Sequence, residues 1–156
     1  MTIQIKGIPT EDARHLQRSG VDANGQLPEA LISDGNGNPC RHCLEMIAEG
    51  EELLVFSYKP FSSDQPYAER GPAFLHKREC SSTEANNELP DILWASDTYI
   101  VRGYSDQEKI VSGTGQVVPK QKITAYAANL FHNNQVEFVH VRSSSNNCYL
   151  ARIEKT

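Results

Sequence analysis

The chain has 156 residues, and its 20 acidic against 15 basic side chains give a net charge of −5. This length fits one folded domain, so we expect residues 1–156 to form a single domain. The acidic balance makes nucleic acid an unlikely partner, because phosphate binding draws on a broad positive field. The sequence has neither a run of ~20 apolar residues that could span a bilayer nor the long apolar stretch of a signal peptide. We therefore expect a cytoplasmic protein without membrane contact.

Short elements separated by turns are predicted in the first half of the chain. Thr10 precedes two acidic residues and is the expected cap of the first helix. A stretch rich in Asn, Gly, Asp and Pro delivers the chain to Cys40. The expected elements are a strand at 3–5, a helix from 10 to 20, an extended piece at 29–33, one helical turn at 44–48, strands at 53–58 and 73–75, and a polar linker at 81–87.

The second half of the chain has clearer periodicity. Apolar positions between 123 and 131 follow helical spacing after Pro119, which we expect at the first helical position. The further predictions are a short helix from Leu89 to Trp94, a strand at 98–104, an extended segment at 109–118, and a β-hairpin formed by 136–142 and 148–153. The predicted class is α+β, with a mixed or mostly antiparallel sheet and two or three helices.

Four residues in the first half have the spacing of a metal site. Cys40 and Cys43 are separated by two residues, and His76 precedes Cys80 by four positions. Two donors on a Cys-x-x-Cys turn and two from a distant segment are the set that tetrahedral zinc requires. We therefore predict zinc bound within a knuckle-like segment at 38–81. Four protein ligands leave no open position for water, which favours a structural role.

The thiols also allow other interpretations. Cys40 with Cys43 could form a redox-active dithiol, although no thioredoxin-like pattern surrounds them. The cysteines could instead be inert buried thiols, or two of them could form a disulfide. His42 lies inside the knuckle, and we expect it to be solvated or to contact a ligand rather than to bind the metal.

The sequence around these residues resembles a known class of zinc-binding segment. Cys40-x-x-Cys43 with Gly50-Glu51, an apolar strand, and then Gly71-Pro-x-Phe74-x-His76 is similar to treble-clef fingers of the LIM and poly(ADP-ribose) polymerase types. Those fingers have two residues between the histidine and the last cysteine, whereas three precede Cys80. The ligand loop must therefore differ here.

Tyrosines accompany arginines at three places and suggest a pocket for an anionic small molecule. They are Tyr67, Arg102-x-Tyr104, and Cys148-Tyr149 with Arg152. The alternative is that these side chains cover sheet edges and make structural hydrogen bonds. His140 is expected to be a satisfied histidine within a strand. The carboxylates, Glu51 and Glu69 among them, are expected on a solvated surface. No sequence motif singles out an acid–base pair or a phosphate-binding loop.

A wider resemblance then emerges from the ordered set Pro39-Cys40-Arg41, Gly50-Glu51, Pro66-Tyr67, Gly71-Pro72-x-Phe74, Arg102-x-Tyr104, Val139-His140-Val141 and Cys148-Tyr149-x-Ala151-Arg152. From about Ile3 to Glu154, the chain resembles the bacterial family called "domain of unknown function 1203". The resemblance implies a small bacterial protein and restricts the metal site to a subset of members. Any shared function would then rest on Cys40, Arg41, Tyr67, Arg102, Tyr104, His140, Cys148 and Arg152.

Three functions follow as hypotheses from this sequence. The first is a protein with a structural zinc site that binds a small molecule or a partner protein. The second is an enzyme that uses a thiol, Cys40 or Cys148, in a pocket lined by Arg41, Tyr67 and Arg102; the two thiols could meet in space. The third is a finger-like module for nucleic acid, which the net charge disfavours.

Overall fold

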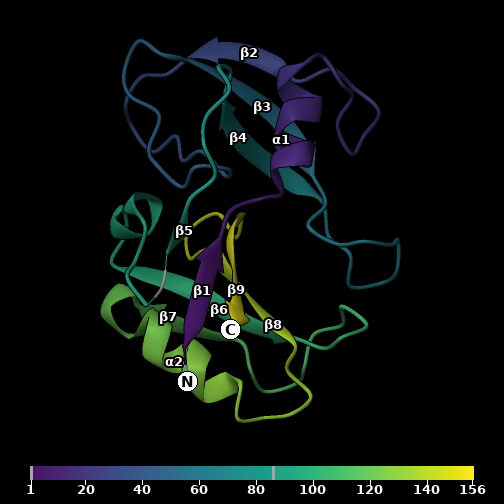
Figure 1. Cartoon of the computed structure of the whole chain (residues 1–156), viewed down its shortest axis with the longest axis vertical. Coiled ribbons are helices and arrows are strands. Elements are labelled where there is room, and N and C mark those ends of the chain that lie inside the picture. The colour runs from purple at the N-terminus through teal and green to yellow at the C-terminus, as the bar shows by residue number, and fades with distance from the viewer. Residues whose placement is uncertain (1, 86) are drawn as a thin grey trace.

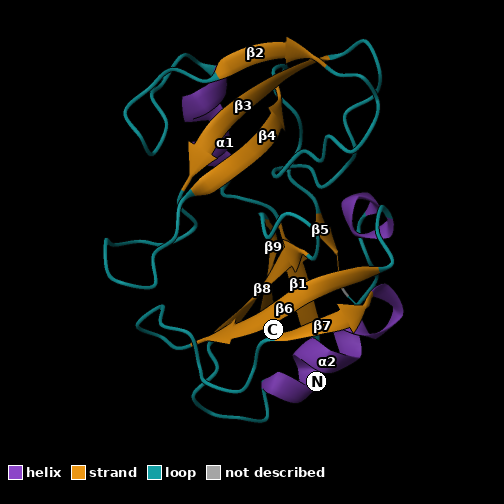
Figure 2. Cartoon of the chain, turned by 180° about the vertical axis from the view of Figure 1, so that it is seen from behind, coloured by secondary structure: helices purple, strands orange, loops and turns teal. Residues whose placement is uncertain are grey.

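The computed structural model describes residues 2–85 and 87–156, which form two antiparallel sheets and two α-helices. In Figures 1 and 2, a three-stranded sheet with α1 lies at one end of the molecule and a six-stranded sheet with α2 at the other. The strands are β1 (Ile3–Lys6), β2 (Glu29–Ile32), β3 (Glu52–Tyr58), β4 (Gly71–His76), β5 (Glu84–Ala85), β6 (Thr98–Tyr104), β7 (Gln116–Pro119), β8 (Phe138–Ser143) and β9 (Tyr149–Lys155); the helices are α1 (Thr10–Gln17) and α2 (Ile123–Leu130), with 3₁₀ segments η1 (Asp91–Trp94) and η2 (Lys120–Lys122).

The six-stranded sheet has the order β5-β1-β9-β8-β6-β7 and contains the larger apolar core. Helix α2 buries Ile123 and Ala127, one helical turn apart, against apolar residues of the central strands such as Val139 and Val141. Strand β8 is buried along nearly its whole length. Its even-numbered residues therefore face away from α2, toward the other half of the molecule, because side chains alternate across a strand.

The three-stranded sheet, β2-β3-β4, builds a second core together with α1. Ala13 and Leu16 lie three positions apart on the buried face of α1. They pack in one cluster with β3 and β4 residues such as Leu53 and Leu75, and this cluster includes the thiols of Cys40, Cys43 and Cys80. The metal-binding pattern is therefore part of the apolar core of this half.

A close backbone crossing joins the two halves near Gly7, between β1 and α1. A Cβ atom at Gly7 would lie 2.3 Å from the carbonyl oxygen of His42 and 2.5 Å from that of Arg41. The next amide, of Ile8, donates to the Arg41 carbonyl at 2.8 Å. Only glycine allows this approach, because any side chain would overlap the backbone of the turn at 40–43, which we call the knuckle.

Most predicted elements are confirmed, including the α+β class, the strands at 53–58 and 98–104, and the C-terminal hairpin. All pairings between the named strands are antiparallel, and a single parallel bridge joins Cys40 to Phe74. The predicted linker at 81–87 contains the two-residue strand β5, and one of its positions, 86, lies outside the described residues. None of the helices in the described ranges combines the length and the apolar character needed to cross a membrane.

Three local predictions are wrong. Thr10 is not a cap: Pro9 precedes the helix, and the Thr10 hydroxyl is instead 2.8 Å from Nε2 of His42. Residues 44–48 form no helical turn, since Leu44 has a φ of 63° and Met46 bridges back to Pro39. Tertiary contacts of the knuckle override local propensity there. Pro119 ends β7 and precedes the 3₁₀ turn rather than occupying its first position.

Replacing Gly7 with alanine is expected to destabilise the fold by about 2–4 kcal/mol, since the new methyl group overlaps two carbonyl oxygens. Urea denaturation monitored by circular dichroism measures the change. Gly71→Ala is the matched control, because nothing lies within 4 Å of a Cβ placed there. Equal stability of the two variants would mean that the crossing tolerates a side chain.

Candidate functional site

The four predicted metal ligands converge on one buried point. The donor atoms of Cys40, Cys43, His76 and Cys80 all lie within 4.8 Å of one another, and all four side chains are buried. The Sγ atoms of Cys40 and Cys80 are 3.8 Å apart, and Sγ of Cys43 lies 3.5 Å from Nδ1 of His76. All four cysteines of the chain are free thiols. The structure therefore contains no disulfide at this point.

Two segments bring these donors together. The first is the turn at Cys40–Leu44, closed by a hydrogen bond from the Leu44 amide to the Cys40 carbonyl at 3.1 Å. The second is the end of β4, where His76 pairs with Leu53 and leads into the loop that carries Cys80. The His76 amide lies 3.5 Å from Sγ of Cys40, so the strand end also supplies a backbone donor to the sulfur.

The three clustered thiols differ in acidity because they share hydrogen bonds. Donation from Cys43 and Cys80 lowers the pKa of Cys40, with further help from the Cys43 and His76 amides. The same bonds to Cys40 raise the pKa of Cys43 and of Cys80. Cys40 is thus the first thiolate of the cluster. A bound cation would displace the other two protons, because only thiolates bind metals strongly.

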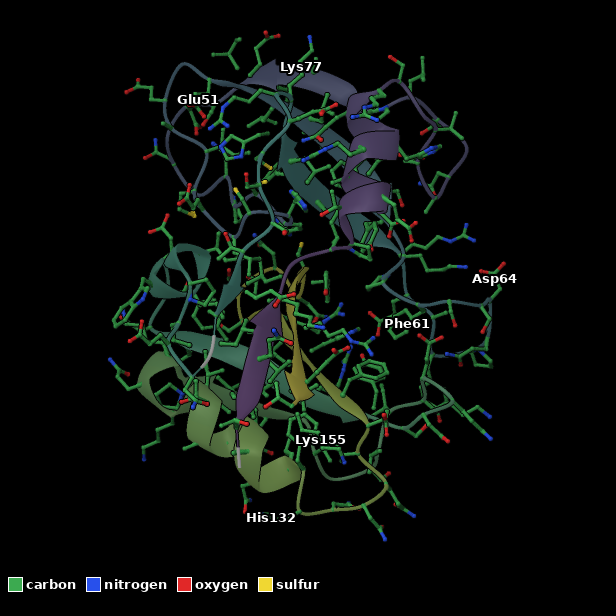
Figure 3. The ribbon with its side chains drawn as sticks, viewed as in Figure 1. Glu51, Phe61, Asp64, Lys77, His132 and Lys155 are labelled. Carbon is green, nitrogen blue, oxygen red and sulfur yellow. The ribbon has the colours of Figure 1, made fainter. Side chains whose placement is uncertain are left out.

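His76 is oriented by a carboxylate on its far side. Its Nε2 lies 3.2 Å from Oε2 of Glu51, and the imidazole is buried whereas Glu51 is partly exposed. This contact fixes the proton on Nε2 and leaves the Nδ1 lone pair facing the sulfurs. Glu51 was predicted on a solvated surface, and its side chain is 39% exposed, but the contact with His76 was not predicted. Figure 3 shows it at the same end of the molecule as the clustered sulfur atoms.

His42 belongs to the surroundings of the cluster rather than to the solvent. Its side chain is fully buried, with Nδ1 3.1 Å from Sγ of Cys80 and Nε2 2.8 Å from the Thr10 hydroxyl. Burial lowers its pKa, so the imidazole is neutral and carries one proton. With a cation bound, Cys80 would be a thiolate that can only accept, and the imidazole proton would then lie on Nδ1. The Thr10 hydroxyl then donates to Nε2.

The donor set and its spacing fit a tetrahedral divalent cation. Bonds of about 2.3 Å to sulfur and 2.0–2.1 Å to nitrogen give tetrahedral edges of about 3.8 Å between sulfurs and about 3.5 Å between sulfur and nitrogen. The two distances observed between donor atoms, 3.8 and 3.5 Å, match these edges. Three thiolates with one imidazole are also a zinc-type donor set, and the site provides four protein ligands.

Glu51→Gln is expected to weaken zinc binding about ten- to a hundred-fold, because the amide no longer holds the Nε2 proton of His76 as a carboxylate does. Competition against a chromogenic chelator measures the affinity. Glu52→Gln is the matched control, since Glu52 pairs with Lys77 at the surface. A Glu51 variant with unchanged affinity would show that the carboxylate has no role in ligand orientation.

A second group of predicted residues lies in one row across the six-stranded sheet. Arg102 pairs with His140, His140 with Arg152, and Arg152 with Lys6, through four neighbouring strands. Because directly paired residues share a face, these side chains point to the same side, away from α2. Tyr104 lies beside the row, and its hydroxyl accepts a hydrogen bond from Nε of Arg102 at 2.9 Å.

His140 is enclosed by aromatic rings at the middle of this row. The rings of Phe61, Tyr104, Phe138 and Tyr149 have centroids 4.6–5.3 Å from the imidazole. Neither ring nitrogen has a hydrogen-bond partner within the described part of the chain. The prediction of a satisfied strand histidine is therefore wrong. Figure 3 shows Phe61 at the junction between the two sheets.

Glu69 neutralises part of the charge on this sheet face. One of its oxygens lies 3.1 Å from Arg102 and the other 3.0 Å from the buried Arg142. Glu69 lies at the surface, as expected, and its two ion pairs also tie the loop between β3 and β4 to the sheet. Tyr67, from the same loop, is 41% exposed and does not join the row.

Arg41 and Cys148 lie apart from the row. Nε of Arg41 donates to the Tyr149 carbonyl and Nη1 to the Pro39 carbonyl, each at 2.8 Å, and burial lowers its pKa to about 10. Sγ of Cys148 contacts the Asn146 carbonyl at 3.7 Å, whereas that of Cys40 lies in the metal cluster. The two thiols thus have different surroundings and do not form the pair considered from the sequence.

Sequence reasoning missed Thr10, Glu51 and Phe61 as parts of these sites. A signal existed for Glu51, because it lies just before the predicted strand at 53–58, and pairing of that strand with the one ending at His76 places it beside that ligand. Thr10 offered only a helix-cap pattern. Phe61 lies in a loop whose docking on the sheet depends on tertiary contacts that no local pattern encodes.

Comparison with family models gives one match. The model described as "Protein of unknown function (DUF1203)" matches residues 37–155. The chain belongs to this family. The match includes all four metal ligands and most of the six-stranded sheet, whereas β1, α1 and β2 precede it. No curated protein and no solved structure matches the chain.

His140→Phe is expected to stabilise the protein, and more so at low pH. Burial, together with Arg152, Arg142 and Arg102, holds the pKa of His140 well below its usual range. Below pH ~6.5 the imidazole of His140 binds a proton in the unfolded state but stays neutral in the folded state. The free energy of unfolding of the wild type therefore falls by up to about 1.4 kcal/mol per pH unit as pH decreases.

Urea denaturation at pH 8 and pH 5 measures this effect as the difference between variant and wild type. Metal ligands titrate in both proteins, so the difference isolates His140. His132→Gln, at an exposed position, is the control. A difference that does not grow between pH 8 and pH 5 would contradict the assignment of a neutral buried imidazole.

Proposed function

We propose that this protein carries a structural zinc ion and acts by binding a small polar molecule in a cavity between its two sheets. The observation that carries the zinc assignment is the convergence of Cys40, Cys43, His76 and Cys80 within 4.8 Å, with two of the donor separations equal to tetrahedral edges. Four protein ligands leave no vacant coordination position. The ion would therefore hold the structure together rather than activate water.

A zinc ion at this point would reinforce the backbone bridge that joins Cys40 to Phe74 on β4. It would link the knuckle at 40–43 to the end of β4, and through His42 it would also reach Thr10 on α1. The three-stranded sheet is small, and metal–ligand bonds can supply on the order of 10 kcal/mol of apparent folding free energy in such modules. Zinc would then be a condition for this half to fold.

The proposed binding cavity lies next to this cluster, between the two halves. It encloses about 550 Å³, which falls within the range of small-molecule sites. Its lining combines Thr10, His42 and Tyr58 from the three-stranded half with Lys6 and Arg152 from the six-stranded sheet. His42 contacts both the cavity and Cys80. Loss of the metal would therefore disturb the cavity wall.

The charges around the cavity favour a ligand that is polar and carries both donors and acceptors. Lys6 and Arg152 both pair with Glu154, at 2.8 and 2.6 Å, so this wall keeps one positive charge in excess. The Tyr58 hydroxyl donates to the Asp12 carboxylate at 3.0 Å on the opposite wall. A site with a cation in excess on one wall and a carboxylate on the other favours a small polar molecule that carries both hydrogen-bond acceptors and donors.

Metal analysis of the protein purified without chelator tests the zinc assignment. We expect about one zinc ion per chain by inductively coupled plasma mass spectrometry. Less than a tenth of an equivalent, in protein that is folded, would overturn it. Cys43→Ser is expected to lose the ion and to unfold the three-stranded half, because one ligand and its charge are removed.

Cys148→Ser provides the matched control, since this thiol lies outside the cluster. Amide NMR signals of Thr10 and Tyr58 report separately on the cavity. Chelation should broaden or shift both signals if the metal supports the cavity wall. Unchanged signals after complete zinc removal would separate the cavity from the metal site.

A further inference from the structure

A second groove lies along the knuckle and shares no lining residue with the inter-sheet cavity. It encloses about 580 Å³. One wall comes from the knuckle and β4, through Met46 and Phe74, and the other from the six-stranded sheet and η1, through Ile92, Tyr99 and Leu150. Small polar residues of the β8–β9 turn, such as Ser145 and Asn146, form its rim. The walls are thus apolar and the entrance is polar.

Arg41 supplies the charge inside this groove. Arg41 is only 3% exposed, yet no carboxylate of the described residues lies within ion-pair distance of it. Two backbone carbonyls, of Pro39 and Tyr149, accept from Nη1 and Nε. Both hydrogen-bond acceptors are neutral, so apart from the thiolates of the neighbouring metal cluster, no anion of the described residues balances this buried charge.

The remaining terminal nitrogen of Arg41, Nη2, is the one available to a ligand. It has no hydrogen-bond partner among residues 2–85 and 87–156. Within those residues, the side-chain nitrogen and oxygen atoms that are both unpaired and fully enclosed are the two ring nitrogens of His140, so Nη2 is not fully enclosed. Because Arg41 lines the groove, Nη2 is the nitrogen that a ligand in the groove would meet. The two carbonyl contacts hold the guanidinium in place, so its orientation is fixed before any ligand arrives.

We propose that this groove binds a monocarboxylate with an apolar body, its carboxylate paired with Arg41 and its chain or ring packed between the walls. A single buried cation matches one negative charge better than the several of a polyphosphate. The apolar walls contribute affinity by removing the ligand's hydrocarbon surface from water. This inference concerns a site other than the inter-sheet cavity and does not depend on the ligand proposed there.

Titration with decanoate and with 1-decanol tests the proposal, because the two probes differ only in the charged group. Isothermal titration calorimetry on zinc-loaded protein should show decanoate binding at one site and 1-decanol binding at least tenfold more weakly. Arg41→Gln should weaken decanoate binding at least tenfold. Arg18→Gln, which removes an exposed arginine paired with Glu79, should leave it unchanged. Equal affinities for the acid and the alcohol would overturn the proposal.

A second measurement requires no variant, in case Arg41→Gln fails to fold. Cys148 lines the groove, and the other three cysteines lie in the metal cluster. Decanoate should slow alkylation of Cys148 by iodoacetamide several-fold in the zinc-loaded wild-type protein, as read from peptide mass spectrometry, and an equal concentration of 1-decanol should not. Unchanged alkylation at decanoate concentrations that saturate the calorimetric signal would place the probe elsewhere and overturn the assignment. Full zinc content in the same sample keeps this outcome separate from a failure of the metal site.

Discussion

The convergence of three sulfurs and one imidazole is the constraint on which the three-stranded half depends. These donors come from a turn and from the end of a strand more than thirty residues later. Nothing in the short elements nearby would bring them together on propensity alone, and the turn even places Leu44 at a positive φ. The surrounding hydrogen bonds agree with one another. Glu51 orients His76, His42 contacts Cys80, and Thr10 completes His42.

Contacts made by knuckle residues join the two halves. Gly7 lets the chain pass against the carbonyls of Arg41 and His42, and the Arg41 side chain reaches the Tyr149 carbonyl on β9. Both contacts use residues next to the metal ligands. The same few residues thus set the position of the cluster, one wall of the inter-sheet cavity and the charge within the second groove. A change in the knuckle would therefore alter the cluster, the cavity and the second groove together.

Periodicity and donor chemistry made much of this structure predictable. The spacings Cys40-x-x-Cys43 and His76-x-x-x-Cys80 identified all four donors, enrichment in aromatic and β-branched residues identified β3, and alternation identified the C-terminal hairpin. The strand pattern did not reveal which strands would be neighbours, so the row of Arg102, His140 and Arg152 could not be assembled from sequence. The position of the loop carrying Phe61 and Glu69 could not be predicted from the sequence either. Its position depends on ring packing and ion pairs that form only once the sheet exists.

The pairing of β1 with β9 has a consequence for folding during synthesis. Ile3 pairs with Lys155, so the six-stranded sheet unites strands that leave the ribosome more than 150 residues apart. All ligands and strands of the other half lie before residue 81. That half can therefore fold, around the zinc ion we propose, while the remainder is still being translated. Strand β1, attached to the folded three-stranded half, cannot pair with β9 until β9 leaves the ribosome.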